Sequence, residues 1–225
     1  MYSKLWHAPY LPVGRKVQIV NPYKKTQMAK EKEENKTQPI KGPSLGYTDN
    51  FQKREMWKEI AKELNGELKI KHSSGHELEI HNISIPYKKW NIRISVSDSR
   101  PLKFQISFSA SQDFNLILSQ EDFIDRIIEK FRKPAIQSGL KEFDKYYLIK
   151  SNRSDLVKSV ITKEIQKTLL RHNVYSLSYQ TDPAARTAEL ISVIQRRAGN
   201  KEMIFELIEM YKLLIDNLER SRIIK

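Results

Sequence analysis

The sequence predicts an α+β fold, in which an antiparallel β-meander packs with amphipathic helices and an extended N-terminal arm precedes the domain. Short alternating apolar and polar segments follow one another between residues 67 and 118, apolar residues recur at helical spacing near the C-terminus, and residues 1–48 show neither period. We therefore assign an arm to 1–48 and an α+β domain to 49–225. The 225 residues include no cysteine, so this core has to be stable without disulfides.

The arm is basic, proline-rich and partly aromatic. It carries nine Lys or Arg residues against three Glu, and its five prolines favour an extended or irregular backbone. Aromatic residues at this density are not expected to remain in water, so the arm is interpreted as a docking segment for a partner protein, a membrane surface or nucleic acid. The residues assigned to this contact are Trp6, Tyr10, Tyr23, Lys24 and Lys25.

The arm also allows a structural role or a later translation start. Residues 17–20 could add an edge strand to the chain's own domain, which would make the arm a structural element. Alternatively, translation could start at Met28, in which case residues 1–27 would not belong to the native chain.

The first half of the domain is expected to be a helix followed by a meander. Asp49 or Asn50 can cap the helix, and Asn65-Gly66 can end it. Gly, Pro, Asp and Ser residues then separate short alternating segments, as turns separate strands. The five expected strands cover residues 67–71, 77–83, 90–96, 102–108 and 114–118.

The second half is expected to mix helices and strands. A short helix over 122–131 would cover the apolar sheet face, and a strand would follow over 143–149. Asn152 or Ser154 would cap a long helix reaching about residue 170, then strands 174–179 and 187–194 precede a last helix over 200–221. The apolar row of the long helix consists of Val157, Ile161, Ile165 and Leu169.

The net charge of +13 is concentrated in two parts of the sequence. The arm contributes +6, and residues 126–173, with twelve basic and five acidic residues, contribute +7. In the expected long helix, Lys163, Lys167 and Arg171 follow at intervals of four and form a row away from the apolar row. This row is a candidate anion-binding surface for nucleic acid, anionic lipid or an acidic protein; a merely solvated helix face is the alternative.

Catalytic chemistry has the weakest support in the sequence. His72, His76 and His81 lie close together and would suit a metal-dependent hydrolase, but His72 and His76 flank a turn, where a spacing of four does not align side chains. Serine-nucleophile motifs and phosphate-binding glycine loops are absent from the sequence. We therefore expect no catalytic residues, no bound metal, no cofactor and no small-molecule substrate.

Two motifs resemble a group of uncharacterised bacterial proteins. Residues 57–66 read W-K-E-I-A-K-E-L-N-G and fit the pattern W-x-x-[IL]-A-x-x-L-x-G, and residues 143–152 read F-D-K-Y-Y-L-I-K-S-N and fit F-D-x-x-[FY]-x-I-x-x-N. In that group the motifs frame a soluble α+β domain that commonly accompanies membrane-spanning helices. The resemblance, over residues 51–220, implies a fold and a membrane-associated setting without an assigned activity. This chain carries its arm where such helices would be expected.

These observations favour a non-enzymatic accessory or scaffolding component that docks through its arm onto a larger assembly, including a membrane-associated one. A protein partner is expected, in the cytoplasm or at the membrane periphery. One alternative is a nucleic-acid or anionic-surface binding protein that uses region 126–173. The other is the metal-dependent hydrolase built on His72, His76 and His81.

Overall fold

The computed structural model describes residues 52–72, 79–97, 100–120, 136–194 and 200–225, all within the unit Pro43–Lys225. The arm and the expected helix over 122–131 lie outside the described residues. The proposed caps Asp49 and Asn50 lie outside them as well.

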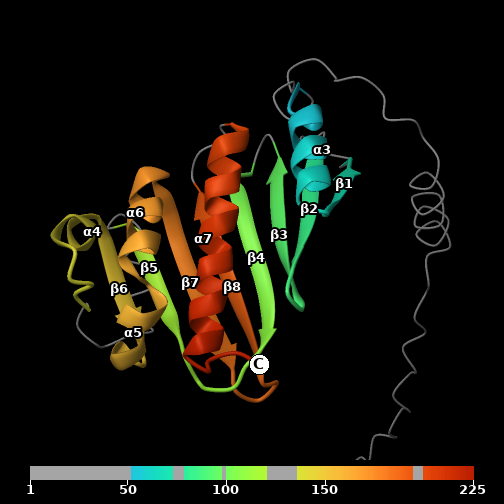
Figure 1. Ribbon diagram of the computed structural model, residues 1–225. Helices are drawn as coiled ribbons and strands as arrows, with labels where there is room; N and C mark the ends of the chain where they lie inside the picture. Colours follow the sequence, from blue (N-terminus) through green and yellow to red (C-terminus); the bar gives the residue numbers. More distant parts are fainter. Residues whose placement is uncertain (1–51, 73–78, 98–99, 121–135, 195–199) are drawn as a thin grey trace, which may run out of the picture. The chain divides into compact units, whose positions relative to one another are not determined.

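Eight described strands form one antiparallel sheet, which confirms the α+β fold class (Figure 1). Their order across the sheet is β1-β2-β3-β4-β8-β7-β5-β6. The strands are β1 (Glu67–Lys71), β2 (Ile80–Tyr87), β3 (Trp90–Ser97), β4 (Leu102–Ser109), β5 (Leu116–Gln120), β6 (Tyr147–Ser151), β7 (Val174–Asp182) and β8 (Thr187–Ile194).

The meander is confirmed for β1–β4, but the assignment of a fifth meander strand was wrong. β8 pairs with the whole of β4, and β5 lies between β7 and β6. The burial of β5 explains the difference: Leu116, Ile117 and Leu118 are buried in succession, as in a strand covered on both faces. Alternation of apolar and polar residues identifies a strand, whereas tertiary packing decides which strand pairs with it in the sheet.

The hairpin between β2 and β3 is tighter than expected. Tyr87 pairs with Trp90, which leaves only Lys88 and Lys89 in the loop, with Lys88 in the left-handed region at φ 53°. Pro86, expected in the turn, belongs to β2 and pairs with Asn91. A proline is tolerated there because the paired residues of β1 end opposite Ser84, so the missing N–H interrupts no ladder on that side.

The strand expected over 143–149 is a helix followed by a shorter strand. α4 (Lys141–Tyr146) precedes β6, and the rings of Phe143 and Tyr147 stack at 4.6 Å with an interplanar angle of 15°. A spacing of four brings two side chains together on a helix as readily as it places them on one strand face. The expectation that Phe143, Tyr147 and Ile149 belong to the core is confirmed.

The long helix expected from Ser154 is two helices, α5 (Ser154–Val160) and α6 (Lys163–Arg171). Thr162 has an extended backbone, and the Gln166 side-chain amide donates to the Ile161 carbonyl at 2.9 Å, which satisfies an acceptor freed by the break. The apolar row is nevertheless fully buried as predicted. Neither expected cap is present, because Arg153 occupies the N-cap position and makes no side-chain cap.

The helices cover one face of the sheet. α7 (Lys201–Arg220) lies over the sheet and runs roughly along the strands (Figure 1). Its Tyr211 ring stacks on Phe104 of β4 at 4.6 Å. α3 (Arg54–Glu63) contacts β1, β2 and α7, while α5 and α6 also contact α7. The strand residues facing these helices are mostly apolar, and the opposite face of β2–β4 presents polar side chains such as Asn82, Arg93 and Gln105.

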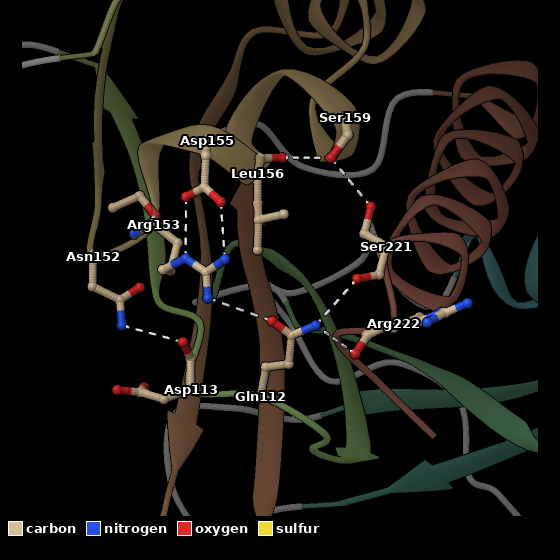
Figure 2. Close-up of polar contacts among 10 residues, drawn as sticks. Gln112, Asp113, Asn152, Arg153, Asp155, Leu156, Ser159, Ser221 and Arg222 are labelled. Carbon is tan, nitrogen blue, oxygen red and sulfur yellow. Dashed lines mark hydrogen bonds and ion pairs between the residues drawn. The ribbon is translucent and has the colours of Figure 1, made fainter.

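The C-terminal residues are fixed to the sheet by a polar network (Figure 2). The Gln112 side-chain amide donates to the carbonyl oxygens of Ser221 and Arg222 at 3.3 and 3.0 Å, and Ser111 N–H donates to the Ile223 carbonyl at 2.8 Å. Arg153 joins α5 to this network through Gln112. Ile223 and Ile224 are consequently buried.

The end of α3 depends on two adjacent residues. Asn65 is in the left-handed region at φ 50°, and Gly66 N–H donates to the Ala61 carbonyl at 2.7 Å. A Cβ on Gly66 would lie 2.7 Å from the backbone oxygen of Ser84 in β2. Gly66 is therefore required for the close approach of α3 to the sheet, whereas Asn65 makes the left-handed turn.

We expect Gly66→Ala to destabilise the domain by about 1–3 kcal/mol, since backbone of a paired strand has to move to admit the methyl group. Urea unfolding measures this loss. Asn65→Gly is the control and should change stability by less than about 0.5 kcal/mol, because glycine adopts positive φ readily. Equal stability of the wild type and Gly66→Ala would contradict the close approach.

Candidate functional site

A basic groove lies between α4 and α6 at the end of β5. Its volume is about 730 Å³, and α4 and α6 contact each other beneath it. We call it the α4–α6 groove. Its lining consists of Gln120, Glu142, Lys145, Tyr146, Tyr147, Lys167, Leu170, Arg171 and Asn173.

Tyr147 fixes the position of the two groove walls. Its hydroxyl, which lies in a buried setting, donates towards the carbonyl oxygens of Leu169 at 3.0 Å and Val174 at 2.6 Å. Leu169 belongs to the last turn of α6, where carbonyls lack helical partners. Burial raises the pKa of the Tyr147 hydroxyl, which keeps it a neutral donor at physiological pH.

The cations of the groove differ in their pairing. Lys145 on α4 and Lys167 on α6 are exposed and make no ion pair with any residue that the structure describes. Arg171 donates to Glu206 on α7 at 2.9 Å. The hydrogen bonds from Arg171 and His172 lower the pKa of the Glu206 carboxyl, so Arg171 is held beside a stable carboxylate. Lys145 and Lys167 are therefore the groove cations available to a ligand.

Tyr146 presents an aromatic ring to solvent at the edge of the groove. It is 52% exposed and is the only large hydrophobic side chain exposed in the described parts of the chain. The Lys145 ammonium lies 5.7 Å from its ring centroid. Tyr146 was not predicted as a site residue, because residues 143–149 were assigned to a strand. A helix whose buried face carries Phe143 and Tyr147 predicts that Tyr146 lies on the exposed side.

Polar groups complete the groove lining. Gln120 Nε2 donates to Asn173 Oδ1 at 2.5 Å, and Asn173 holds a left-handed turn at φ 49° after α6. Glu142 is the acidic residue of the lining. This combination of cations, amides and an exposed ring suits the binding of an anion, and the described lining contains no nucleophile beside a base.

The structure brings only part of the predicted anion-binding row into the groove. Lys163, Lys167 and Arg171 are all exposed on α6, away from its buried row, but Lys163 lies outside the groove lining. Lys145 joins the other two from α4, which sequence spacing could not show. The docking residues Trp6, Tyr10, Tyr23, Lys24 and Lys25 lie outside the described residues.

The described histidines do not bring together the ligands that the alternative of a metal-dependent hydrolase would need. His72 is exposed, His81 is 0% exposed, and His76 lies outside the described residues. Within the part that the structure describes, no group of three metal-ligating side chains occurs. His81 is buried because its side chain faces the helices from β2.

His81 instead belongs to a buried polar cluster beneath α3. Arg54 Nε donates to Glu79 Oε2 at 2.9 Å, a second guanidinium nitrogen contacts Glu79 Oε1, and His81 Nε2 lies 2.9 Å from Glu79 Oε2. Burial raises the pKa of Glu79, but the hydrogen bonds from Arg54 and His81 outweigh it and lower the pKa below its ordinary value of 4.5. The cluster joins the start of α3 to the start of β2.

No family model and no curated protein matches the chain. Among solved structures, the mycobacterial trehalose monomycolate transport factor A, TtfA, is similar to it, with a TM-score of 0.45 and 7% sequence identity. The match covers 73% of this chain and 93% of that chain. Among the described residues, no helix combines the length and apolar character that crossing a membrane requires. Function has to be inferred from the groove itself.

We expect Tyr147→Phe to lower the free energy of unfolding by about 1–2 kcal/mol, because the buried carbonyls of Leu169 and Val174 lose their shared donor. Denaturant unfolding of the purified chain measures this. Tyr146→Phe removes an exposed hydroxyl and serves as the matched control, with no expected loss. A Tyr147→Phe variant as stable as this control would show that the hydroxyl does not hold α6.

We expect Glu79→Gln to destabilise the domain by about 3 kcal/mol at pH 7, since the charge of Arg54 loses its buried partner. The lowered pKa in the folded state means that this contribution is complete above about pH 4.5 and is lost as pH falls through the folded-state pKa. Unfolding of wild type and variant at neutral and acidic pH measures the difference.

The difference between wild type and Glu79→Gln should therefore shrink below about pH 4.5. Glu55→Gln is the control, because Glu55 is exposed and its ion pair joins it to Lys58 one turn away. A Glu79→Gln effect independent of pH would contradict an ionised Glu79.

Proposed function

We propose that this protein is a non-enzymatic accessory component that attaches to a polyanionic surface of a larger assembly through the α4–α6 groove. The observation that carries the proposal is that the exposed Tyr146 ring lines the same groove as Lys145 and Lys167, two exposed lysines that form no ion pair within the described parts of the chain. Aromatic residues and cations that remain accessible on a preformed groove favour association with a partner.

Some cations on the helical side are committed to internal ion pairs, whereas Lys145 and Lys167 are not paired with any described residue. Two lysines on the helical side neutralise carboxylates from other elements, so they contribute to internal contacts. These pairs are Lys88 with Asp216 and Glu219, and Lys201 with Glu59 and Glu63. The charges of Lys145 and Lys167 are not used in this way among the described residues and remain available to attract an anionic surface.

The proposal keeps the arm as a second attachment point. Its Trp6, Tyr10 and Tyr23, with Lys24 and Lys25, have the composition of a docking peptide. We further propose that the larger assembly contains a protein partner. We place it in the cytoplasm, at the periphery of a membrane. The resemblance of the two sequence motifs to membrane-associated bacterial domains motivates that location.

Affinity capture from the native host's extract tests the attachment. Lys145→Glu/Lys167→Glu should lower recovery of associated components at least about fivefold, because it replaces attraction by repulsion. Lys62→Glu/Lys158→Glu changes the net charge equally at exposed lysines outside the groove and should leave recovery unchanged. Salt near 1 M should release the wild-type complex, since the Debye length falls to about 3 Å.

Equal recovery by the groove variant and its control would refute the groove as an attachment surface. The same assay with a chain beginning at Asp49 examines the arm separately. Undiminished recovery by that shorter chain would refute the docking arm and leave the groove proposal standing.

A further inference from the structure

We infer that the α4–α6 groove binds single-stranded nucleic acid, with one base stacked on Tyr146 and the adjoining phosphates against Lys145 and Lys167. The inference rests on the proposed function and names the class of polyanion. A solvent-exposed ring, two ammonium groups without ion-pair partners in the described chain and a preformed groove occur together here, and each has a part in holding a single strand.

Tyr146 is the stacking platform. Its ring is 52% exposed, whereas Phe143 and Tyr147 on the buried side of the same segment are 0% and 4% exposed. The stacked pair of Phe143 and Tyr147 anchors α4 to the core, so the backbone that carries Tyr146 is already ordered before a ligand arrives. A base can therefore stack on the ring without a further ordering of α4.

The lysines supply the phosphate contacts from both walls. Lys145 lies beside the platform on α4, and Lys167 lines the same groove from α6. On α6, Lys163 lies one turn before Lys167, about 6 Å along the helix axis. It can contact a further phosphate where the nucleic acid leaves the groove. Arg171 remains committed to Glu206, so it adds positive potential without being the principal contact.

The shape of the site favours a single strand over other anions. A duplex keeps its bases within its own stack, so none is available to Tyr146. An anionic bilayer presents a broad surface and does not fill a groove of about 730 Å³. The lining beyond the tyrosines is mostly charged or amide, with Leu170 as its aliphatic member, whereas a protein interface has a more apolar centre.

Binding of the full chain to a fluorescein-labelled oligo(dT) of about 20 nucleotides tests the inference by anisotropy. At about 50 mM salt we expect saturable binding, weakened about 10-fold or more by Tyr146→Ala and retained by Tyr146→Phe. Lys145→Ala/Lys167→Ala should reduce the slope of log affinity against log salt by about 1.4, from about 0.7 per lost contact. Lys62→Ala/Lys158→Ala should leave the slope unchanged.

The inference is overturned if oligo(dT) does not bind, if Tyr146→Ala binds as the wild type does, or if both lysine pairs alter the slope equally. Vesicles of phosphatidylcholine and phosphatidylserine at about 2:1, and a duplex of equal length, are the comparison ligands. Groove-dependent binding of vesicles or duplex in preference to oligo(dT) also overturns it, but leaves the proposed attachment function intact. If capture by the groove variant also equals its control, both the inference and the proposed function fail.

Discussion

The fold depends on the burial of one helix against one face of the sheet. α7 spans Lys201–Arg220, and its buried side chains recur along a single stripe from Ile204 to Leu218. The stacking of Tyr211 on Phe104 joins this helix to the strand next to β8. Since α3, α5 and α6 all contact α7, these helices take their places from it, and α4 in turn packs on α6 and β6. The opposite face of β2–β4 can then remain polar.

The polar clusters have a different role from the hydrophobic core, since they fix where elements begin and end. Glu79 joins Arg54 at the start of α3 to His81 in β2. Tyr147 similarly donates to the Leu169 carbonyl in the last turn of α6 and to the Val174 carbonyl at the start of β7. Asp144 accepts hydrogen bonds from the Ser138 and Gly139 amides just before α4. The second sequence motif therefore has a structural role: its aromatic and acidic members position α4 and α6, and the groove lies between them.

Local sequence patterns predicted the presence of most elements but not their spatial neighbours. β3, β4 and α7 were predicted correctly because the period of their apolar residues is regular along the whole element. Apolar residues alternate in 90–96 and 102–108, and they recur at helical spacing in α7. β5 could not be placed because pairing with β7 and β6 is decided by distant packing. The basic row on α6 could be predicted from the sequence. That Lys145 and Tyr146 line the same groove could not be predicted, because it depends on how the chain turns from α4 into β6.

The pairing of β4 with β8 also constrains how the protein is made. These strands are separated by about 80 residues of chain, and the tail that follows α7 forms a further bridge between Ile224 and Ala110. During synthesis, β1–β4 can assemble as a meander while the outer edge of β4 still lacks its partner. That temporary edge carries Lys103 and Gln105 on its polar face, which discourages pairing with another nascent chain. The sheet therefore cannot be completed until β8 has been synthesised.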